Sequence, residues 1–184
     1  MKKRLLSFLC LFIVVLSSAQ NSKSIIDSLE RVIATSKDVK KVIDAKARLV
    51  KQYGNAGKRN QAIDLYKKTL IESIKRNYLD GIGSLYNNYA CLLYNEAAYD
   101  SAMHYFEKSL VMREKDNDKI GTIIALNNIG SIYYAFSEYK KGLEYLEKAA
   151  KKEAEAGLEE GTYVSINNIG YIYIGLKLYR KSFY

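Results

Sequence analysis

Three segments of this chain repeat one another at intervals of forty residues, and this repeat restricts its fold more than any other feature. The segments begin at Gly81, Gly121 and Gly161, and each carries a pair of asparagines six residues later. Residues 121–144 and 161–184 are identical at 10 of 24 positions, far above chance for one chain compared with itself. A weaker copy begins at about Lys41. We therefore expect repeated units over about 41–80, 81–120, 121–160 and an incomplete 161–184.

Each copy has two halves in which apolar residues recur at helical spacing. The copy at 121–160 has a polar break at Ser137-Glu138, and its apolar positions are Ile124, Leu126, Ile129, Tyr133 and Tyr134 before the break and Leu143, Leu146, Ala149 and Ala150 after it. The absence of proline favours uninterrupted helices. Because one helical hairpin cannot bury its apolar face alone, the copies must stack. The pattern predicts an all-α solenoid of antiparallel helix pairs.

Small residues recur at one place in each half. The first halves carry Ala90, Gly130 and Gly170, and the second halves carry Ala102, Gly142 and Ser182. Glycine inside a helix costs about 1 kcal/mol relative to alanine, so its recurrence needs a structural reason. We expect two helix backbones to approach each other closely at these positions.

The repeat resembles the tetratricopeptide family. The third copy offers Leu126, Ile129, Gly130 and Tyr133 in its first helix, and Gly142, Leu146 and Ala149 in its second. Two departures are the missing closing proline and a period of forty residues in place of about 34. The longer period resembles the elongated variant found in some polarity adaptors and bacterial peptide-sensing regulators. The resemblance implies a right-handed superhelical solenoid that binds a protein or peptide. It also resembles the exported sensor part of bacterial tetratricopeptide signalling proteins.

The first nineteen residues have the layout of a secretory signal peptide. A basic start, Lys2-Lys3-Arg4, is followed by an apolar run from Leu5 to Leu16 and by Ser17-Ser18-Ala19. As a helix, twelve apolar residues reach about 18 Å, too short for a hydrocarbon core of about 30 Å. The sequence predicts cleavage after Ala19, export to the periplasm or beyond, and no stable membrane insertion afterwards. An uncleaved anchor is the alternative.

Residues 20–40 are expected to form an N-terminal capping helix and a linker. Ile25, Ile26, Leu29, Val32 and Ile33 lie at helical spacing, which predicts a helix over 22–36 that covers the first repeat. The alternative is an amphipathic tail that does not pack. Once the signal peptide is removed, Cys91 is the only thiol, so no internal disulfide is expected.

The asparagine pairs are the candidate binding residues: Asn87, Asn88, Asn127, Asn128, Asn167 and Asn168. Asparagine is a poor helix former, because its amide competes for backbone hydrogen bonds. An amide donates and accepts, so stacked pairs could hold the main chain of an extended peptide. In the elongated tetratricopeptide families that this chain resembles, first-helix asparagines on the inner face have this role. The alternative is that one asparagine of each pair bonds between adjacent repeats and stabilises the stack.

Charge is uneven along the chain. Residues 21–80 hold 14 Lys and Arg against 7 Asp and Glu, a net of +7, whereas residues 81–184 hold 12 against 13, a net of −1. An acidic partner would be drawn to the N-terminal half, although solvated helix faces would explain the same charges. Nucleic acid is not expected, since the sequence contains no recognisable nucleic-acid module.

The sequence predicts neither an enzyme nor a cofactor or metal site. His104 is the only histidine and lies beside core positions of a second helix, where a structural or exposed role is expected. Gly81-Ile-Gly83 lacks the third glycine of a nucleotide loop. No cluster has the spacing of metal ligands.

The last copy stops at Ser182-Phe183-Tyr184, where its second helix should begin. Ile172, Ile174, Leu176 and Phe183 are therefore expected to lack cover. Three explanations stay open: a fragment of a longer protein, an end that pairs with another copy, or a truncated gene. The sequence predicts a non-catalytic scaffold that binds a protein or peptide outside the cytoplasm. The alternative is the sensor fragment of a histidine kinase or transcription regulator without its output domain.

Overall fold

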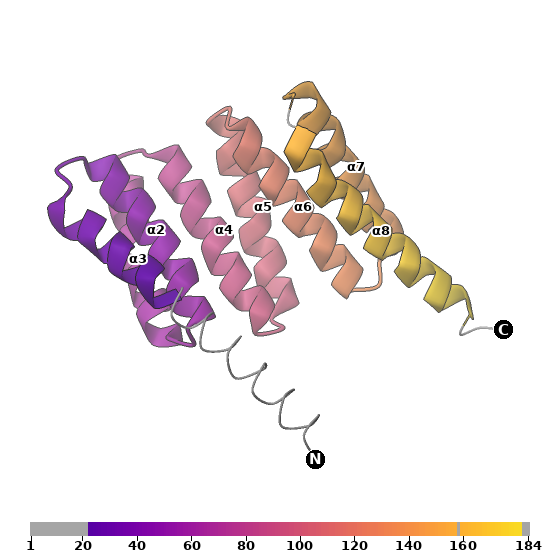
Figure 1. Ribbon diagram of the computed structural model, residues 1–184, viewed down its shortest axis with the longest axis horizontal. Helices are drawn as coiled ribbons and strands as arrows, with labels where there is room; N and C mark the ends of the chain where they lie inside the picture. The colour runs from indigo at the N-terminus through magenta and orange to yellow at the C-terminus, as the bar shows by residue number, and fades with distance from the viewer. Residues whose placement is uncertain (1–21, 158, 182–184) are drawn as a thin grey trace, which may run out of the picture.

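The described part of the chain is entirely helical. The computed structural model describes residues 22–157 and 159–181, so the predicted signal peptide lies outside it. Within these residues the chain forms a helix over 22–35 and no strand. The other helices are α2 (Val39–Asn55), α3 (Arg59–Lys75), α4 (Leu79–Asn95), α5 (Tyr99–Lys115), α6 (Lys119–Ala135), α7 (Tyr139–Glu155) and α8 (Glu159–Lys181). The predicted solenoid of antiparallel pairs is confirmed (Figure 1).

The turns explain why the helices are so regular. Helices α2 to α7 each have 17 residues, and each is followed by a turn of three. The middle residue of every such turn has a positive φ, at Gly57, Asn77, Ala97, Asn117, Ser137 and Gly157. After α4, for example, the Ala98 N–H donates to Leu93 O (2.9 Å) and the Ala97 N–H to Tyr94 O (3.0 Å). This is the Schellman ending, in which a left-handed residue closes the helix and satisfies its last carbonyls.

Ala97 is the least suited of these six residues to its conformation. It is exposed and has a φ of 56°, where the Cβ atom of an L-residue is crowded by the backbone. We expect Ala97→Gly to raise the free energy of unfolding by about 1 kcal/mol, because glycine adopts this region without strain. Urea denaturation would measure the change. Ala56→Gly is the matched control, since Ala56 is also exposed in a turn but has a φ of −85°. Equal effects of both changes would contradict the explanation.

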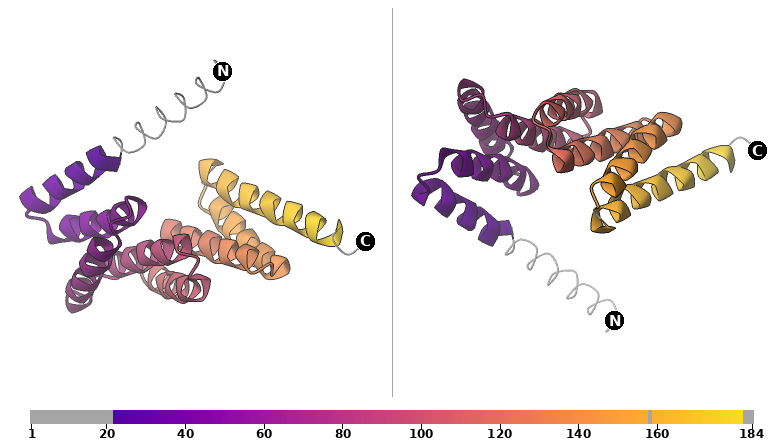
Figure 2. Two further views of the ribbon diagram at one scale, coloured as in Figure 1. Left: turned by 90° about the horizontal axis from the view of Figure 1, so that it is seen from below. Right: turned by 90° about the horizontal axis from the view of Figure 1, so that it is seen from above.

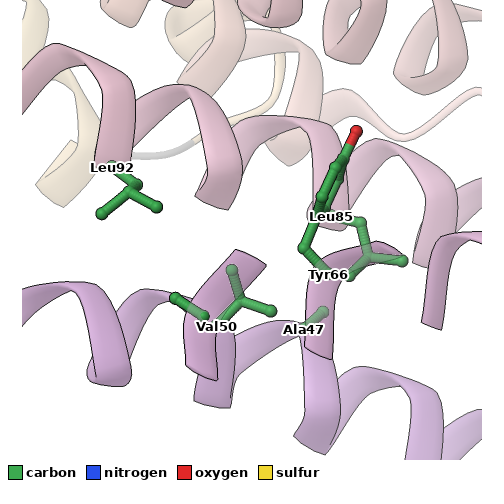
Figure 3. Close-up of a cluster of buried hydrophobic side chains, with 6 residues drawn as sticks. Ala47, Val50, Tyr66, Leu85 and Leu92 are labelled. Atoms are coloured by element: carbon green, nitrogen blue, oxygen red, sulfur yellow. The ribbon is translucent and has the colours of Figure 1, made fainter. Parts of the chain in front are cut away.

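The hydrophobic core runs along the array as overlapping clusters. One cluster joins α2, α3 and α4 through Ala47, Val50, Ala62, Tyr66, Leu85 and Leu92. Figure 3 shows Val50 and Leu92 facing each other across this interface. The next cluster joins α4, α5 and α6 through Ala90, Leu93, Ala102, Phe106, Ile129 and Ile132. Each cluster draws on two successive repeats, so stacking completes a core that no single hairpin could form.

The close backbone approach predicted at the small residues is confirmed between α6 and α7. A Cβ atom added to Gly130 would lie 2.7 Å from Leu146 Cγ and 3.2 Å from the Gly142 carbonyl oxygen. A Cβ on Gly142 would likewise lie 3.2 Å from the Gly130 carbonyl oxygen. Ala90 and Ala102, the corresponding residues of α4 and α5, are both fully buried.

The last helix differs from the expected pattern. The register predicts a break before Tyr179, yet α8 continues without interruption to Lys181. Leu176-Lys177-Leu178, which stand where the other repeats turn, are good helix formers. Ile172 is also not uncovered as expected: it is 1% exposed, because its side chain packs beside Gly142 of α7. Ile174 does lack cover, at 56% exposed, and Phe183 lies outside the described residues.

The array is curved, and its two ends lie on the same side. Figure 2 shows the helix over 22–35 and α8 on one side of the curved row that the other helices form. First helices stack on first helices, α2 on α4 and α6 on α8. In the helix over 22–35, Ile26 is buried and Glu30 accepts a hydrogen bond from the Tyr53 hydroxyl of α2 (2.9 Å).

Candidate functional site

The second asparagine of each pair bonds to the preceding repeat. Asn88 Nδ2 of α4 donates to the Ala47 carbonyl of α2 at 2.8 Å. Asn128 Nδ2 of α6 donates to Asn87 Oδ1 at 2.8 Å, and Asn168 Nδ2 of α8 donates to Asn127 Oδ1 at 3.3 Å. Each bond spans 41 residues, so the three form one ladder between adjacent first helices.

This ladder is the arrangement that the structural alternative describes. The pairs nevertheless differ in exposure: Asn127 is 6% exposed, Asn167 is exposed, and the other four are half-buried. An amide has two donor hydrogens and two acceptor lone pairs, so one bond to a neighbouring repeat leaves capacity for more. Contact between these residues and a ligand therefore stays a prediction.

Asn87 and Asn88 line a cavity of about 760 Å³ on the inner side of the array. The helix over 22–35 forms one wall with Ser24, Ile25, Ser28 and Leu29. The opposite side is polar and basic, with Arg48, Lys51 and Gln52 of α2, Ser84, Asn87 and Asn88 of α4, Arg113 of α5 and Ile124 of α6. The cavity thus combines two apolar side chains, Ile25 and Leu29, with hydrogen-bonding groups and positive charge, a combination suited to a peptide backbone and acidic side chains.

Arg113 is a buried cation that joins two repeats. Its side chain is 10% exposed and contacts the carboxylates of Asp80 and Asp118, the latter at 2.7 Å. Its second terminal nitrogen donates to Ser84 Oγ at 2.6 Å. Gly83 and Gly121 make room for it, because a Cβ on either would lie within 3.0 Å of the Arg113 side chain. Asp118 also caps α6 by accepting from the Gly121 N–H. Arg113 therefore links the end of α5 to the starts of α4 and α6.

A tyrosine extends this polar network toward α2. The Tyr78 hydroxyl lies 2.9 Å from Asp44 Oδ1 and 3.0 Å from Asp80 Oδ2. Burial raises the pKa of the Asp44 carboxyl, against the opposing effect of the Tyr78 hydrogen bond. Burial and the two carboxylate contacts raise the pKa of the Tyr78 hydroxyl, so it remains a donor at neutral pH.

At the position equivalent to Arg113, forty residues later, the next repeat has a buried carboxylate, Glu153. Glu153 is 1% exposed, and its Oε1 accepts from Ser165 Oγ at 2.9 Å. Its Oε2 is buried without a hydrogen-bond partner in the described structure. Ser165 also contacts Asn127, which connects the asparagine ladder to this carboxylate. The sequence analysis missed Arg113 and Glu153, although their forty-residue spacing places two charges at a core position.

His104 and the tyrosines, the other residues considered for a functional role, lie beside other aromatic rings. His104 is exposed on α5, with its ring 5.4 Å from that of Tyr105. Tyr66 and Tyr89 stack at 4.2 Å, and Tyr105 meets Tyr89 edge to face at 4.8 Å. In the described residues, no group of three or more His, Cys, Asp or Glu side chains could hold a metal ion. Among those same residues, no helix is long and apolar enough to cross a membrane.

Comparison with known proteins identifies the repeat directly at one place. Residues 83–115, which cover most of α4 and all of α5, match the family model described as a tetratricopeptide repeat. A comparison with curated proteins found no match.

Three solved structures illustrate the similarity of fold. BtubC (BKLC) from P. vanneervenii has a TM-score of 0.68 and 16% identity, with 90% of this chain and 70% of that chain covered. A signal-transduction ATPase with a tetratricopeptide repeat sensor, from Pyrococcus horikoshii, has a TM-score of 0.73 and 22% identity over 91% of this chain and 26% of its own. A Rap protein complexed with Competence and Sporulation Factor has a TM-score of 0.71 and 14% identity over 90% of this chain and 48% of its own.

This chain therefore spans about a quarter and about half of the lengths of the last two proteins. Identities this low establish the fold alone. Together the comparisons show a tetratricopeptide-like helical solenoid, with a repeat of that family at residues 83–115.

Proposed function

We propose that this chain is a non-catalytic scaffold that binds a peptide or protein in the cavity on its inner side, outside the cytoplasm. The observation that supports this most is the cavity itself, which Arg48, Lys51 and two asparagines line together with Ile25 and Leu29 of the helix over 22–35. Export rests on the predicted signal peptide. The similar fold of the Rap protein, which was solved complexed with Competence and Sporulation Factor, supports a binding role.

The charge of the cavity favours an acidic ligand. Arg48 and Lys51 are both exposed, and residues 21–80 carry a net charge of +7 from 14 basic and 7 acidic residues. Neither side chain belongs to a salt bridge among the described residues, so both are available to a ligand. A positive cleft of this kind raises the local concentration of acidic segments, and added salt weakens the effect.

A binding experiment can separate this role from stability. The probe is a library of random ten-residue peptides, immobilised and sorted by net charge. We expect the protein to retain acidic peptides preferentially and the double variant Arg48→Ala, Lys51→Ala to lose about tenfold or more in affinity, since two ligand contacts are removed. Its thermal unfolding should be unchanged. Lys67→Ala, Lys68→Ala is the matched control, because both lysines are exposed on α3 and lie outside the cavity. Equal loss in the two double variants would contradict the proposed site.

The asparagines need a separate measurement, because they also join the repeats. Asn87→Ala removes both a cavity-lining amide and the acceptor of the Asn128 bond. We expect a lower unfolding temperature and, in peptide binding measured well below that temperature, a further loss of affinity. Binding that stays normal while the protein is folded would assign the asparagine a structural role alone.

The second candidate function is the sensor part of a longer signalling protein. The similarity to an ATPase that carries a tetratricopeptide repeat sensor favours it, together with the 26% of that protein that this chain spans. Sequencing the DNA beyond the codon for Tyr184 tests it. A continuing frame with further repeats, an apolar stretch of about 20 residues and an output domain would support the sensor, whereas a stop codon would exclude it.

A further inference from the structure

One face of α8 is apolar and has no cover among the described residues. Ile166, Tyr173 and Ile174 are 52%, 56% and 56% exposed, and all lie within about 60° of Gly170 around the helix. A Cβ atom placed on Gly170 would meet nothing within 4 Å. The opposite face of α8 is packed on the array through Ser165 and Ile172, which are 0% and 1% exposed. The exposed face is therefore separate from the repeat core and from the cavity.

The preceding repeat shows what such a face accepts. Gly130, Leu126 and Tyr133 of α6 stand forty residues before Gly170, Ile166 and Tyr173. Gly130 is buried under Leu146 and beside the backbone of Gly142, Leu126 is 4% exposed, and Tyr133 stacks on Tyr145 at 5.4 Å. The α7 partners are Leu146 and Gly142 for Gly130 and Tyr145 for Tyr133, while Leu126 shares a cluster with Ala149 of α7 and Leu110 of α5. The face on α8 therefore matches the surface on which α7 packs. It fits an antiparallel helix that has a small residue at the crossing point, an aromatic residue three positions later and a large aliphatic residue four positions later.

The sequence of α8 itself meets this description. In α7 the partner residues are Gly142, Tyr145 and Leu146, and in α8 the same spacing gives Gly170, Tyr173 and Ile174. The same helix therefore provides both the exposed face and the residue spacing that packs against it. A two-fold symmetric contact between identical chains requires this self-complementarity.

We propose that two copies of this chain associate through α8, packed antiparallel about a two-fold axis at Gly170. Gly170 lies against Gly170 of the second copy, as Gly130 lies against Gly142. Ile174 of the second copy fills the space over Gly170, as Leu146 does over Gly130, and Ile166 packs beside it. None of the cavity-lining residues lies on α8, so a dimer would present two ligand sites and could bind a two-site partner with increased avidity.

Sedimentation equilibrium of the full chain over a range of concentrations tests the pairing. We expect a reversible monomer–dimer equilibrium and, for Gly170→Arg, a dissociation constant weakened by about tenfold or more, because a long charged side chain occupies the crossing point. The monomer should fold normally, since a Cβ atom at position 170 would meet nothing within 4 Å. Ile166→Gln provides a second disruption if Gly170→Arg proves poorly folded by circular dichroism.

Val164→Gln is the matched control on the same helix. Val164 is 54% exposed but lies about 120° around α8 from Gly170, so its replacement should leave the dimer intact. In addition, in a chain that starts at Gln20 and so lacks Cys10, Gly170→Cys should form a disulfide-linked dimer on mild oxidation, while the same chain without this change, whose Cys91 has a pKa raised by burial, should not. A wild-type protein that remains monomeric at every concentration would overturn the proposal. So would a dimer that Val164→Gln disrupts as much as Gly170→Arg does.

Discussion

Replacing Arg113 by Met is expected to lower the free energy of unfolding by about 3 kcal/mol, the range found when one partner of a buried ion pair is removed. Methionine preserves most of the apolar stem between Gly83 and Gly121 but removes the guanidinium. Asp80, Asp118 and Ser84 then lose their shared donor. Because the side chains of Asp80 and Asp118 are 38% and 25% exposed, water can replace part of these contacts, and the loss should not exceed this range.

Chemical denaturation of the variant and of Arg76→Met would check this expectation. Arg76 is 51% exposed and lies 3.6 Å from Glu72, in a surface ion pair worth well under 1 kcal/mol. Arg113→Lys should recover only part of the loss, because a lysine cannot reach three oxygens with a planar fork. If Arg113→Met were no more destabilising than Arg76→Met, the buried network would not be what joins these repeats.

Replacing Gly130 by Leu is expected to lower the free energy of unfolding by about 2–3 kcal/mol, or to prevent folding altogether. The first added carbon would already lie 2.7 Å from Leu146 Cγ and 3.2 Å from the backbone oxygen of Gly142. Leu146 is 1% exposed and has little room to move, and the backbone of α7 cannot move without disturbing the core. The gain in helix propensity, about 1 kcal/mol, does not offset this crowding.

Gly170→Leu is the matched control, because it makes the same change at the equivalent position of α8. There the first added carbon would meet nothing within 4 Å, so the monomer should be unchanged or more stable by up to about 1 kcal/mol. Thermal unfolding of both variants in dilute protein, about 1 µM, keeps self-association out of the comparison. Similar destabilisation by both changes would mean that close packing at Gly130 is not the cause.

Much of the fold could be predicted from the sequence because its signals are local. Ser137-Glu138 interrupts a helical pattern, and the structure has its turn there. The recurrence of Gly130 and Gly142 predicted a close approach of two backbones, and the structure confirms it. The prediction was wrong at Ile172, which is buried. Ile172 packs on the preceding repeat beside Gly142, and its equivalent Ile132 is also fully buried, so its cover does not depend on a second helix in the last copy.

The candidate site was only partly predictable. The asparagine pairs were recognised because a poor helix former recurs at one place in three helices. Their bonds could not be predicted, because the partner of Asn88 is a carbonyl in α2 and that of Asn128 is another asparagine. Arg113 and Glu153 were missed, since at core positions of a second helix their burial depends on glycines and side chains of other helices.

The sequence by itself determined the period, the helical hairpins and the places where backbones approach, because helix spacing, turn residues and recurring glycines act over a few residues. Only the tertiary structure decided which groups of the neighbouring repeats the asparagine amides bond to, which carboxylates Arg113 contacts, and which face of α8 lacks cover. Each of these depends on atoms from two or three helices that are forty or so residues apart. A hydrogen bond between two helices forms only when donor and acceptor are placed to within a few tenths of an ångström. Residues that are forty positions apart reach this placement only once the repeats have stacked.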